Sequence, residues 1–155
     1  MKKLFLILTL ISIPLTSASS NRDDLLTFAS KHSVNDTVSQ FVHLLEKKGF
    51  TIFDKIEHSL AASKVGIKLS DTTVIIFGNP KIGSKLMQCS PTIAIDLPQK
   101  ALIWKDAKNQ VWLSVNNPEY LKKRHNVQGC DSFFSKIKAA LTTISNKATS
   151  NPLSK

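Results

Sequence analysis

Three strand-like runs between residues 72 and 115 constrain the fold most strongly. The first, 72–77, is rich in β-branched residues and stops at the turn Gly78-Asn79-Pro80. The other two, 100–105 and 110–115, are joined by a hairpin turn at 107–109. Strands linked by hairpins, with helices kept apart from them, indicate an α+β fold in which helices cover one face of an antiparallel sheet.

Two amphipathic helices are predicted on either side of these strands. Apolar residues at positions 34, 38, 41, 42 and 45 share one helical face. Ser33 is the expected N-cap, with Asp36 completing a capping-box analogue, and Gly49 suits the position after the C-terminus. The last helix is expected to begin with Asp131 as its cap. Its apolar face is formed by Phe133 or Phe134, then Ile137, Leu141 and Ile144.

The remaining segments complete the expected order of strand, helix, four strands with helical insertions, and helix. A weak strand is predicted at 25–31, and another strand at 50–57 with Phe50, Ile52 and Ile56 on one side. Short helical segments are expected at 59–64 and 80–88, and a helix from Pro118 to about His125. Residues 90–99 are predicted to form a loop.

The N-terminus has the pattern of a secretory signal peptide over residues 1–18. Lys2 and Lys3 precede an apolar run at 4–15, and small residues allow cleavage after Ala18. A retained anchor is the alternative interpretation. We therefore expect a periplasmic or secreted protein with one domain at 19–145, a flexible polar tail at 146–155, and no stable membrane span.

The formal net charge of +10 favours anionic partners, such as lipid head groups or acidic polymers, although a solvated basic surface is the simpler and preferred explanation. Nucleic acid is not an expected partner, because the aromatic residues have the pattern of a core and the chain carries an export signal. Cys89 and Cys130 predict one disulfide in an oxidising compartment, worth on the order of 4 kcal/mol. The alternative is two free thiols, one of them available to a metal.

Several sequence phrases carry a family resemblance over roughly residues 33 to 145. They are Glu57-His58, Ile76-Phe77-Gly78-Asn79-Pro80, Ile95-Asp96-Leu97-Pro98, Val111-Trp112 and Arg124-His125. In this order they resemble the bacterial family called domain of unknown function 302. The resemblance implies a TATA-binding-protein-like α+β fold, strand-helix-four strands-helix, and a homodimer, but it supplies no catalytic residues. Ser84, Val115 and Asn117 depart from the usual family pattern, and the last two weaken the turn at 114–117 as a fixed chemical site.

Polar residues near the ends of the predicted strands are the candidate binding residues. They are His58, Asn79, Gly83, Asp96, Lys100 and Asn116. We expect them to share one hollow that holds a small or anionic ligand. The structural alternatives are an Asp96–Lys100 salt bridge, a turn made by Asn79, and a His58 bonded to local backbone.

Two other functions are weighed against a binding or structural module. An enzyme would use His58, Asp96 and Lys100 for acid–base chemistry. A copper or redox carrier would use Met87 and Cys89, with His58 or His125 available elsewhere. The sequence has no CxxCH, no Gly-x-Ser-x-Gly and no phosphate-binding loop, so no cofactor, metal or catalytic residue is predicted.

Overall fold

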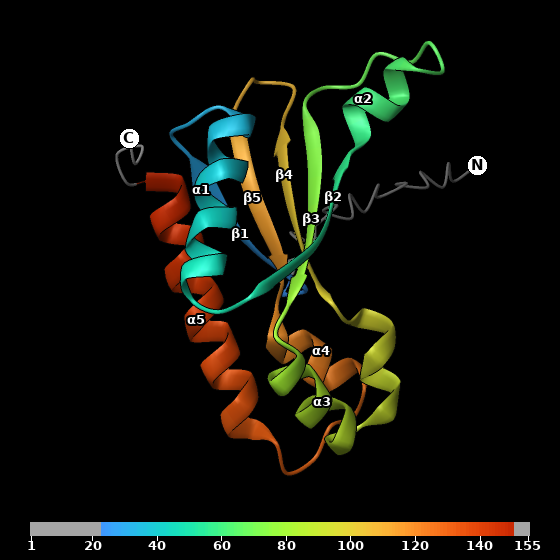
Figure 1. The fold of residues 1–155 in the computed structure, drawn as a ribbon, viewed down its shortest axis with the longest axis vertical. Helices are drawn as coiled ribbons and strands as arrows, with labels where there is room; N and C mark the ends of the chain where they lie inside the picture. The colour runs from blue at the N-terminus through green and yellow to red at the C-terminus, as the bar shows by residue number, and fades with distance from the viewer. Residues whose placement is uncertain (1–22, 151–155) are drawn as a thin grey trace, which may run out of the picture.

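A five-stranded antiparallel sheet forms the centre of the protein in a computed structural model that describes residues 23–150 (Figure 1). The strand order is β1-β5-β4-β3-β2. The strands are β1 (Leu25–Ser30), β2 (Thr51–Glu57), β3 (Thr72–Gly78), β4 (Gln99–Lys105) and β5 (Val111–Asn116). The predicted α+β class and the predicted order of strand, helix, four strands and helix are confirmed.

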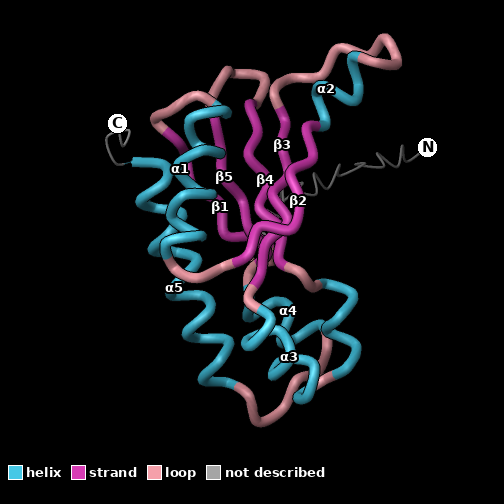
Figure 2. Tube along the Cα trace, viewed as in Figure 1, coloured by secondary structure: helices cyan, strands magenta, loops and turns pink. Residues whose placement is uncertain are grey.

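The helices divide into groups around this sheet (Figure 2). The elements are α1 (Val34–Lys47), α2 (His58–Ser63), α3 (Pro80–Cys89), the 3₁₀ helix η1 (Pro91–Asp96), α4 (Pro118–Arg124) and α5 (Asp131–Ser150). Helices α1 and α5 pack beside the strands, whereas α3 and α4 lie beyond one end of the sheet and α2 lies at the opposite end (Figure 1). The two ends of the sheet therefore carry different insertions.

The core lies between the sheet and the two long helices. Alternate residues of β3, β4 and β5 are buried against α1 and α5, as expected for a sheet that has helices on one face. Phe41 of α1 meets Phe77 of β3 edge to face, with ring centroids 5.6 Å apart. A second apolar cluster, under α3, η1 and α4, consists of Leu86, Ile93, Leu121, Val127 and Phe134.

The local signals that bound α1 act as predicted. The Ser33 hydroxyl oxygen accepts a hydrogen bond from the Asp36 amide at 3.1 Å, and the hydroxyl donates to Asp36 Oδ2 at 2.6 Å. Gly49 follows the helix with φ of +76°, a conformation that favours glycine. The chain therefore reverses direction tightly between α1 and β2.

Strand β2 departs from the predicted alternation because it contains a bulge. The register with β3 shifts between Ile52, which pairs with Phe77, and Asp54, which pairs with Ile76. One extra residue on a strand moves every later side chain to the other face. Ile56 therefore pairs with Val74, on the face opposite Ile52, and the prediction that they share a side is wrong.

Two further segments differ from the expectations. Residues 91–96 form η1 rather than an irregular loop. Helix α5 continues to Ser150, past the predicted start of the tail at 146, because Ala148 and Thr149 are buried and the Thr149 carbonyl accepts from the Lys31 amide. The predicted signal peptide at 1–18 and residues 151–155 lie outside the described part of the chain.

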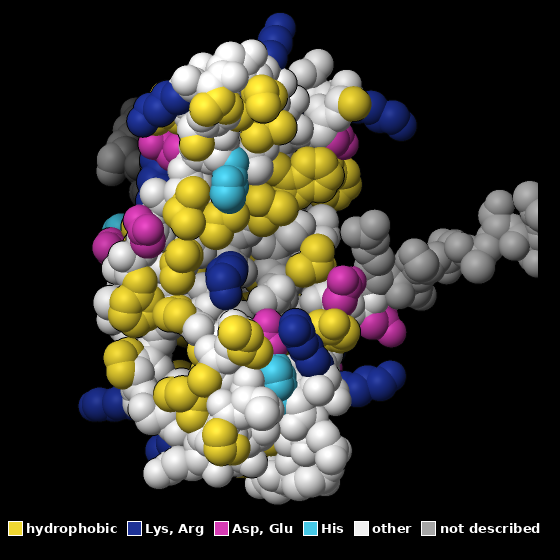
Figure 3. All heavy atoms as spheres, turned by 90° about the vertical axis from the view of Figure 1, so that its right-hand side faces the viewer, with side chains coloured by type: hydrophobic (Ala, Val, Ile, Leu, Met, Phe, Trp, Pro, Cys, Tyr) yellow, Lys and Arg dark blue, Asp and Glu magenta, His cyan; other side chains and the backbone are white. Residues whose placement is uncertain are grey.

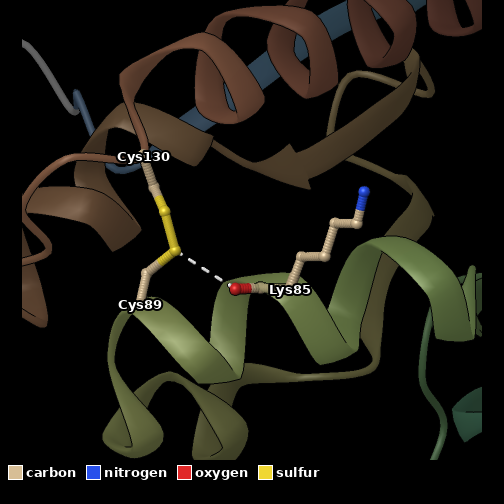
Figure 4. Close-up of a disulfide and its surroundings, with 3 residues drawn as sticks. All are labelled: Lys85, Cys89 and Cys130. Atoms are coloured by element: carbon tan, nitrogen blue, oxygen red, sulfur yellow. Dashed lines mark hydrogen bonds between the residues drawn. A yellow bond between two sulfur atoms is a disulfide. The ribbon is translucent and has the colours of Figure 1, made fainter.

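A disulfide joins Cys89 at the end of α3 to Cys130 just before α5 (Figure 4). The two Cα atoms are 6.5 Å apart, and the Cys89 sulfur also lies 3.1 Å from the Lys85 carbonyl oxygen. The prediction that these cysteines pair is confirmed. Since both sulfurs are used, neither cysteine is a free thiolate for copper.

Candidate functional site

The turn between β3 and α3 is held by the side chain of Asn79. Its Oδ1 accepts a hydrogen bond from the Lys81 amide at 3.0 Å, capping α3, and its Nδ2 donates to the Gly49 carbonyl at 3.1 Å. Pro80 occupies the first turn of the helix, where it costs no hydrogen bond. Asn79 therefore fixes α3 against the end of α1 and sets the position of the pocket next to it.

An apolar pocket of about 290 Å³ lies under α3, which we call the α3 pocket. Its walls come from the start of β2, the end of β3, α3, the segment between η1 and β4, and α5. The apolar side chains that define it are Phe50, Phe53, Ile82, Leu86, Leu97 and Pro98. Concave, mostly apolar pockets of this kind are typical binding sites for small molecules.

One buried polar group, Gln99, belongs to the lining of the α3 pocket. Its residue is only 7% exposed, and its Oε1 has no hydrogen-bond partner among the described residues. An unsatisfied buried polar atom costs about 1–3 kcal/mol, so native structures rarely keep one without a reason. The Oε1 atom is thus an unused acceptor in a residue that lines the pocket.

Glycine at position 83 leaves room in the pocket wall. A Cβ atom built there would meet only Leu97 Cδ1, at 3.9 Å, which is an ordinary contact distance. Because glycine lowers helix stability by about 1 kcal/mol relative to alanine, Gly83 in the middle of α3 has a local cost. The open space beside its Cα is consistent with a ligand approaching the helix backbone.

The six predicted binding residues do not form one site. Asn79 and Gly83 line the α3 pocket, whereas His58, Asp96, Lys100 and Asn116 are not part of its lining. His58 begins α2, at the opposite end of the sheet from α3 (Figure 1). Asn116 ends β5, paired with Leu25 of β1. These six residues, which flank different strands, therefore lie at different places on the molecule.

Asp96 pairs with Arg124 at the end of α4 and with His125 just after it, rather than with Lys100. Its carboxylate lies 2.5 Å from His125 Nε2 and accepts from Arg124 Nη1 at 3.1 Å. His125 Nδ1 lies 3.1 Å from Thr92 Oγ1, so the imidazole bridges both ends of η1. Lys100 is exposed, and its ammonium donates to the Pro98 carbonyl at 3.4 Å. The side chains proposed for acid–base chemistry are therefore not assembled, and Asp96 instead holds η1 to α4.

Sequence reasoning missed Gln99 and the Asp96–His125 pair. A single glutamine at the start of a strand has no distinctive pattern, and 29 residues separate Asp96 from His125. Among residues 23–150, no three His, Cys, Asp or Glu side chains form a group that could hold a metal ion. In the same range, no helix combines the length and apolar character needed to cross a membrane.

A family model described as "Domain of unknown function DUF302" matches residues 26–144, and the chain belongs to this family. A crystal structure of an uncharacterised conserved DUF302 protein from Bacillus stearothermophilus has the same fold. Its TM-score is 0.73 at 14% sequence identity, over 80% of this chain and 97% of that one. The resemblance that the sequence motifs carry is therefore confirmed.

Curated relatives match a shorter stretch. The fluoride-specific ion channel FluC 1 of Brucella suis biovar 1 (strain 1330) is 41% identical over 103 residues, which are 66% of this chain and 41% of the relative. FluC 1 of Brucella abortus biovar 1 (strain 9-941) is also 41% identical over 103 residues, which are 38% of that protein. The matched region thus spans about two fifths of the length of these relatives.

Proposed function

We propose that this protein is a binding module that holds a small, mainly apolar molecule in the α3 pocket. The observation that carries the proposal is the unpartnered Oε1 of Gln99 in a mainly apolar lining. Apolar walls supply affinity by removing ligand surface from water, and a single buried acceptor supplies selectivity for a ligand with a donor group. We place this binding in the periplasm or outside the cell, in keeping with the signal-peptide pattern of the sequence.

Two aromatic probes test this directly by isothermal titration calorimetry of the purified protein. 1-Naphthol carries a hydroxyl donor, and 1-methoxynaphthalene has similar size but no donor. We expect 1-naphthol to bind about 2- to 10-fold more tightly, because a neutral hydrogen bond contributes about 0.5–1.5 kcal/mol. In Gln99→Met, which keeps the side-chain volume, this preference should disappear.

A substitution that fills the α3 pocket tests whether the probes bind there. Gly83→Leu places a side chain beside Leu97 and should weaken both probes while preserving the helix, since leucine favours helices over glycine. Ala61→Leu, on the exposed surface of α2, is the control and should bind both probes like the unmodified protein. The proposal would be contradicted if neither probe binds the unmodified protein. It would also be contradicted if Gly83→Leu binds the probes as tightly as the unmodified protein does.

Fluoride is a second candidate ligand only through the names of the curated relatives. A small anion needs several hydrogen-bond donors or cations around it, and the lining of the α3 pocket is mainly apolar and includes no lysine or arginine. We therefore propose that fluoride does not occupy this pocket. Sodium fluoride added to the 1-naphthol titration, against sodium chloride at equal ionic strength, should leave the 1-naphthol affinity unchanged.

A further inference from the structure

A second hollow adjoins the α3 pocket along α5. This α5 groove has a volume of about 530 Å³ and is defined by Lys48, Phe50, Ile82, Phe133, Lys136 and Ile137. Phe50, Ile82 and Ile137 belong to the linings of both hollows. The two hollows therefore adjoin at these three apolar side chains, and we refer to them together as the trough. Its shape suits a molecule longer than a single ring.

The charges around this trough are all of one sign. Lys48 and Lys136 are the only charged residues in the two linings, and no carboxylate belongs to either. Among the described residues, neither ammonium group makes an ion pair or a side-chain hydrogen bond. Lys85 lies nearby, 5.5 Å from the centroid of the Phe133 ring that lines the α5 groove. The apolar trough is thus open to an anion at its α5 end.

We propose that the α3 pocket and the α5 groove together bind a single-chain anionic amphiphile, with its anionic head near Lys48 and Lys136. The hydrocarbon chain lies across Phe50, Ile82 and Ile137 and reaches into the α3 pocket. This inference rests on the proposed function, and a hydroxyl group carried by the chain inside the α3 pocket would supply the donor that Gln99 Oε1 lacks. A small polar metabolite would leave the apolar walls unused, whereas a neutral apolar molecule would gain no attraction from the two exposed ammonium groups.

Decanoate and 1-decanol distinguish the role of the head group, each titrated by calorimetry below its aggregation limit. Decanoate should bind the protein more tightly than 1-decanol. The double variant Lys48→Gln/Lys136→Gln should lose about tenfold in decanoate affinity and keep its 1-decanol affinity, since each exposed ion pair contributes up to about 1 kcal/mol. The matched control Lys123→Gln/Lys147→Gln removes the same charge from exposed positions outside both hollows and should bind decanoate normally.

The outcomes separate this inference from the proposed function. If the two double variants lose decanoate affinity equally, or if neither loses any, the proposed position of the anionic head group is wrong. If Gly83→Leu still binds 1-naphthol and 1-methoxynaphthalene more weakly in that case, ligand binding in the α3 pocket stands. If Gly83→Leu binds decanoate and 1-decanol like the unmodified protein, the chain does not reach the α3 pocket and this inference fails. The proposed function fails only if Gly83→Leu also binds 1-naphthol normally.

The lipids of a membrane surface also combine anionic head groups with hydrocarbon chains. Flotation with vesicles of phosphatidylglycerol and phosphatidylcholine tests whether the protein binds such a surface. We expect the protein to bind monomeric decanoate and to stay unbound in the flotation assay. Vesicle binding that persists in Gly83→Leu would overturn the inference, because the basic surface rather than the trough would then attract the lipid.

Discussion

At the scale of single residues, the side chain of Gln99 at the start of β4 gives the α3 pocket its unpaired acceptor. Gln99 stands at the first position of β4, opposite Phe77 of β3, where the alternation of the strand turns its side chain toward the helices. The sequence placed this strand within one residue, but a glutamine at a strand start is ordinary. Gln99 becomes a candidate binding residue only because its Oε1 has no hydrogen-bond partner in the folded protein. The residues that surround this oxygen come from distant parts of the sequence, so no local pattern reports it.

Asp106 is a residue whose charge supports the hairpin between β4 and β5. Trp112 Nε1 donates to its carboxylate at 2.9 Å, and the amides of Lys108 and Gln110 donate to Oδ1. The Trp112 hydrogen bond is the largest cause that lowers the Asp106 pKa below its ordinary value of 3.8, and the two amides act in the same direction. The folded state therefore favours the ionised form.

This shift predicts how stability depends on pH. The contribution of Asp106 is complete above its unfolded pKa and is lost as the pH falls through the lower folded pKa. We expect urea denaturation midpoints of the unmodified protein to exceed those of Asp106→Asn at neutral pH. The gap should narrow from about pH 4 downward, as the carboxyl group becomes protonated. Parallel curves across that range would show that the charge of Asp106 has no such role.

At the scale of elements, signals within a few residues were sufficient for most boundaries. Ser33 with Asp36 starts α1, and Gly49 ends its turn, because caps depend on neighbouring backbone groups. The bulge near Phe53 was missed because a bulge depends on pairing with β3, which no local pattern reports. The extension of α5 was missed for a related reason: its last turn is polar in sequence but packs against the N-terminal end of the fold.

The disulfide connects the end of α3 to the residue just before α5, and its removal should lower the free energy of unfolding strongly. A bond that closes a loop of 41 residues is worth on the order of 4 kcal/mol through the unfolded state. We expect Cys89→Ala/Cys130→Ala to lose about that much unfolding free energy in equilibrium urea denaturation. Dithiothreitol should bring the unmodified protein to a similar midpoint and leave the double variant unchanged. A variant as stable as the oxidised protein would contradict this expectation.

At the scale of the whole molecule, one side shows a concentration of apolar surface (Figure 3). Most of the large hydrophobic side chains that are exposed in residues 23–150 lie between positions 53 and 69. They are Phe53, Ile56, Leu60, Val65, Ile67 and Leu69. Strand β2 is also an edge of the sheet, so its outer backbone groups are free to pair. These features support the homodimer that the family resemblance suggested, which stays a prediction.

Light scattering coupled to size-exclusion chromatography tests the dimer. We expect twice the monomer mass at micromolar concentration, and the monomer mass for Ile56→Lys/Leu60→Lys, since buried lysine charges oppose such an interface. Tyr120→Lys, an exposed position on α4, serves as the control and should leave the mass unchanged. A monomer at every concentration, or a dimer that tolerates both lysines, would rule out this interface.

The central claim is that a ligand occupies the α3 pocket, and nuclear magnetic resonance tests it most directly. In ¹H–¹⁵N spectra of the protein titrated with 1-naphthol, we expect the largest shifts at the Gly83 backbone amide and the Gln99 side-chain amide. The amides of His58 and Asn116, which lie outside the pocket lining, should stay in place. Shifts centred on those residues, or none at saturating probe, would contradict the claim.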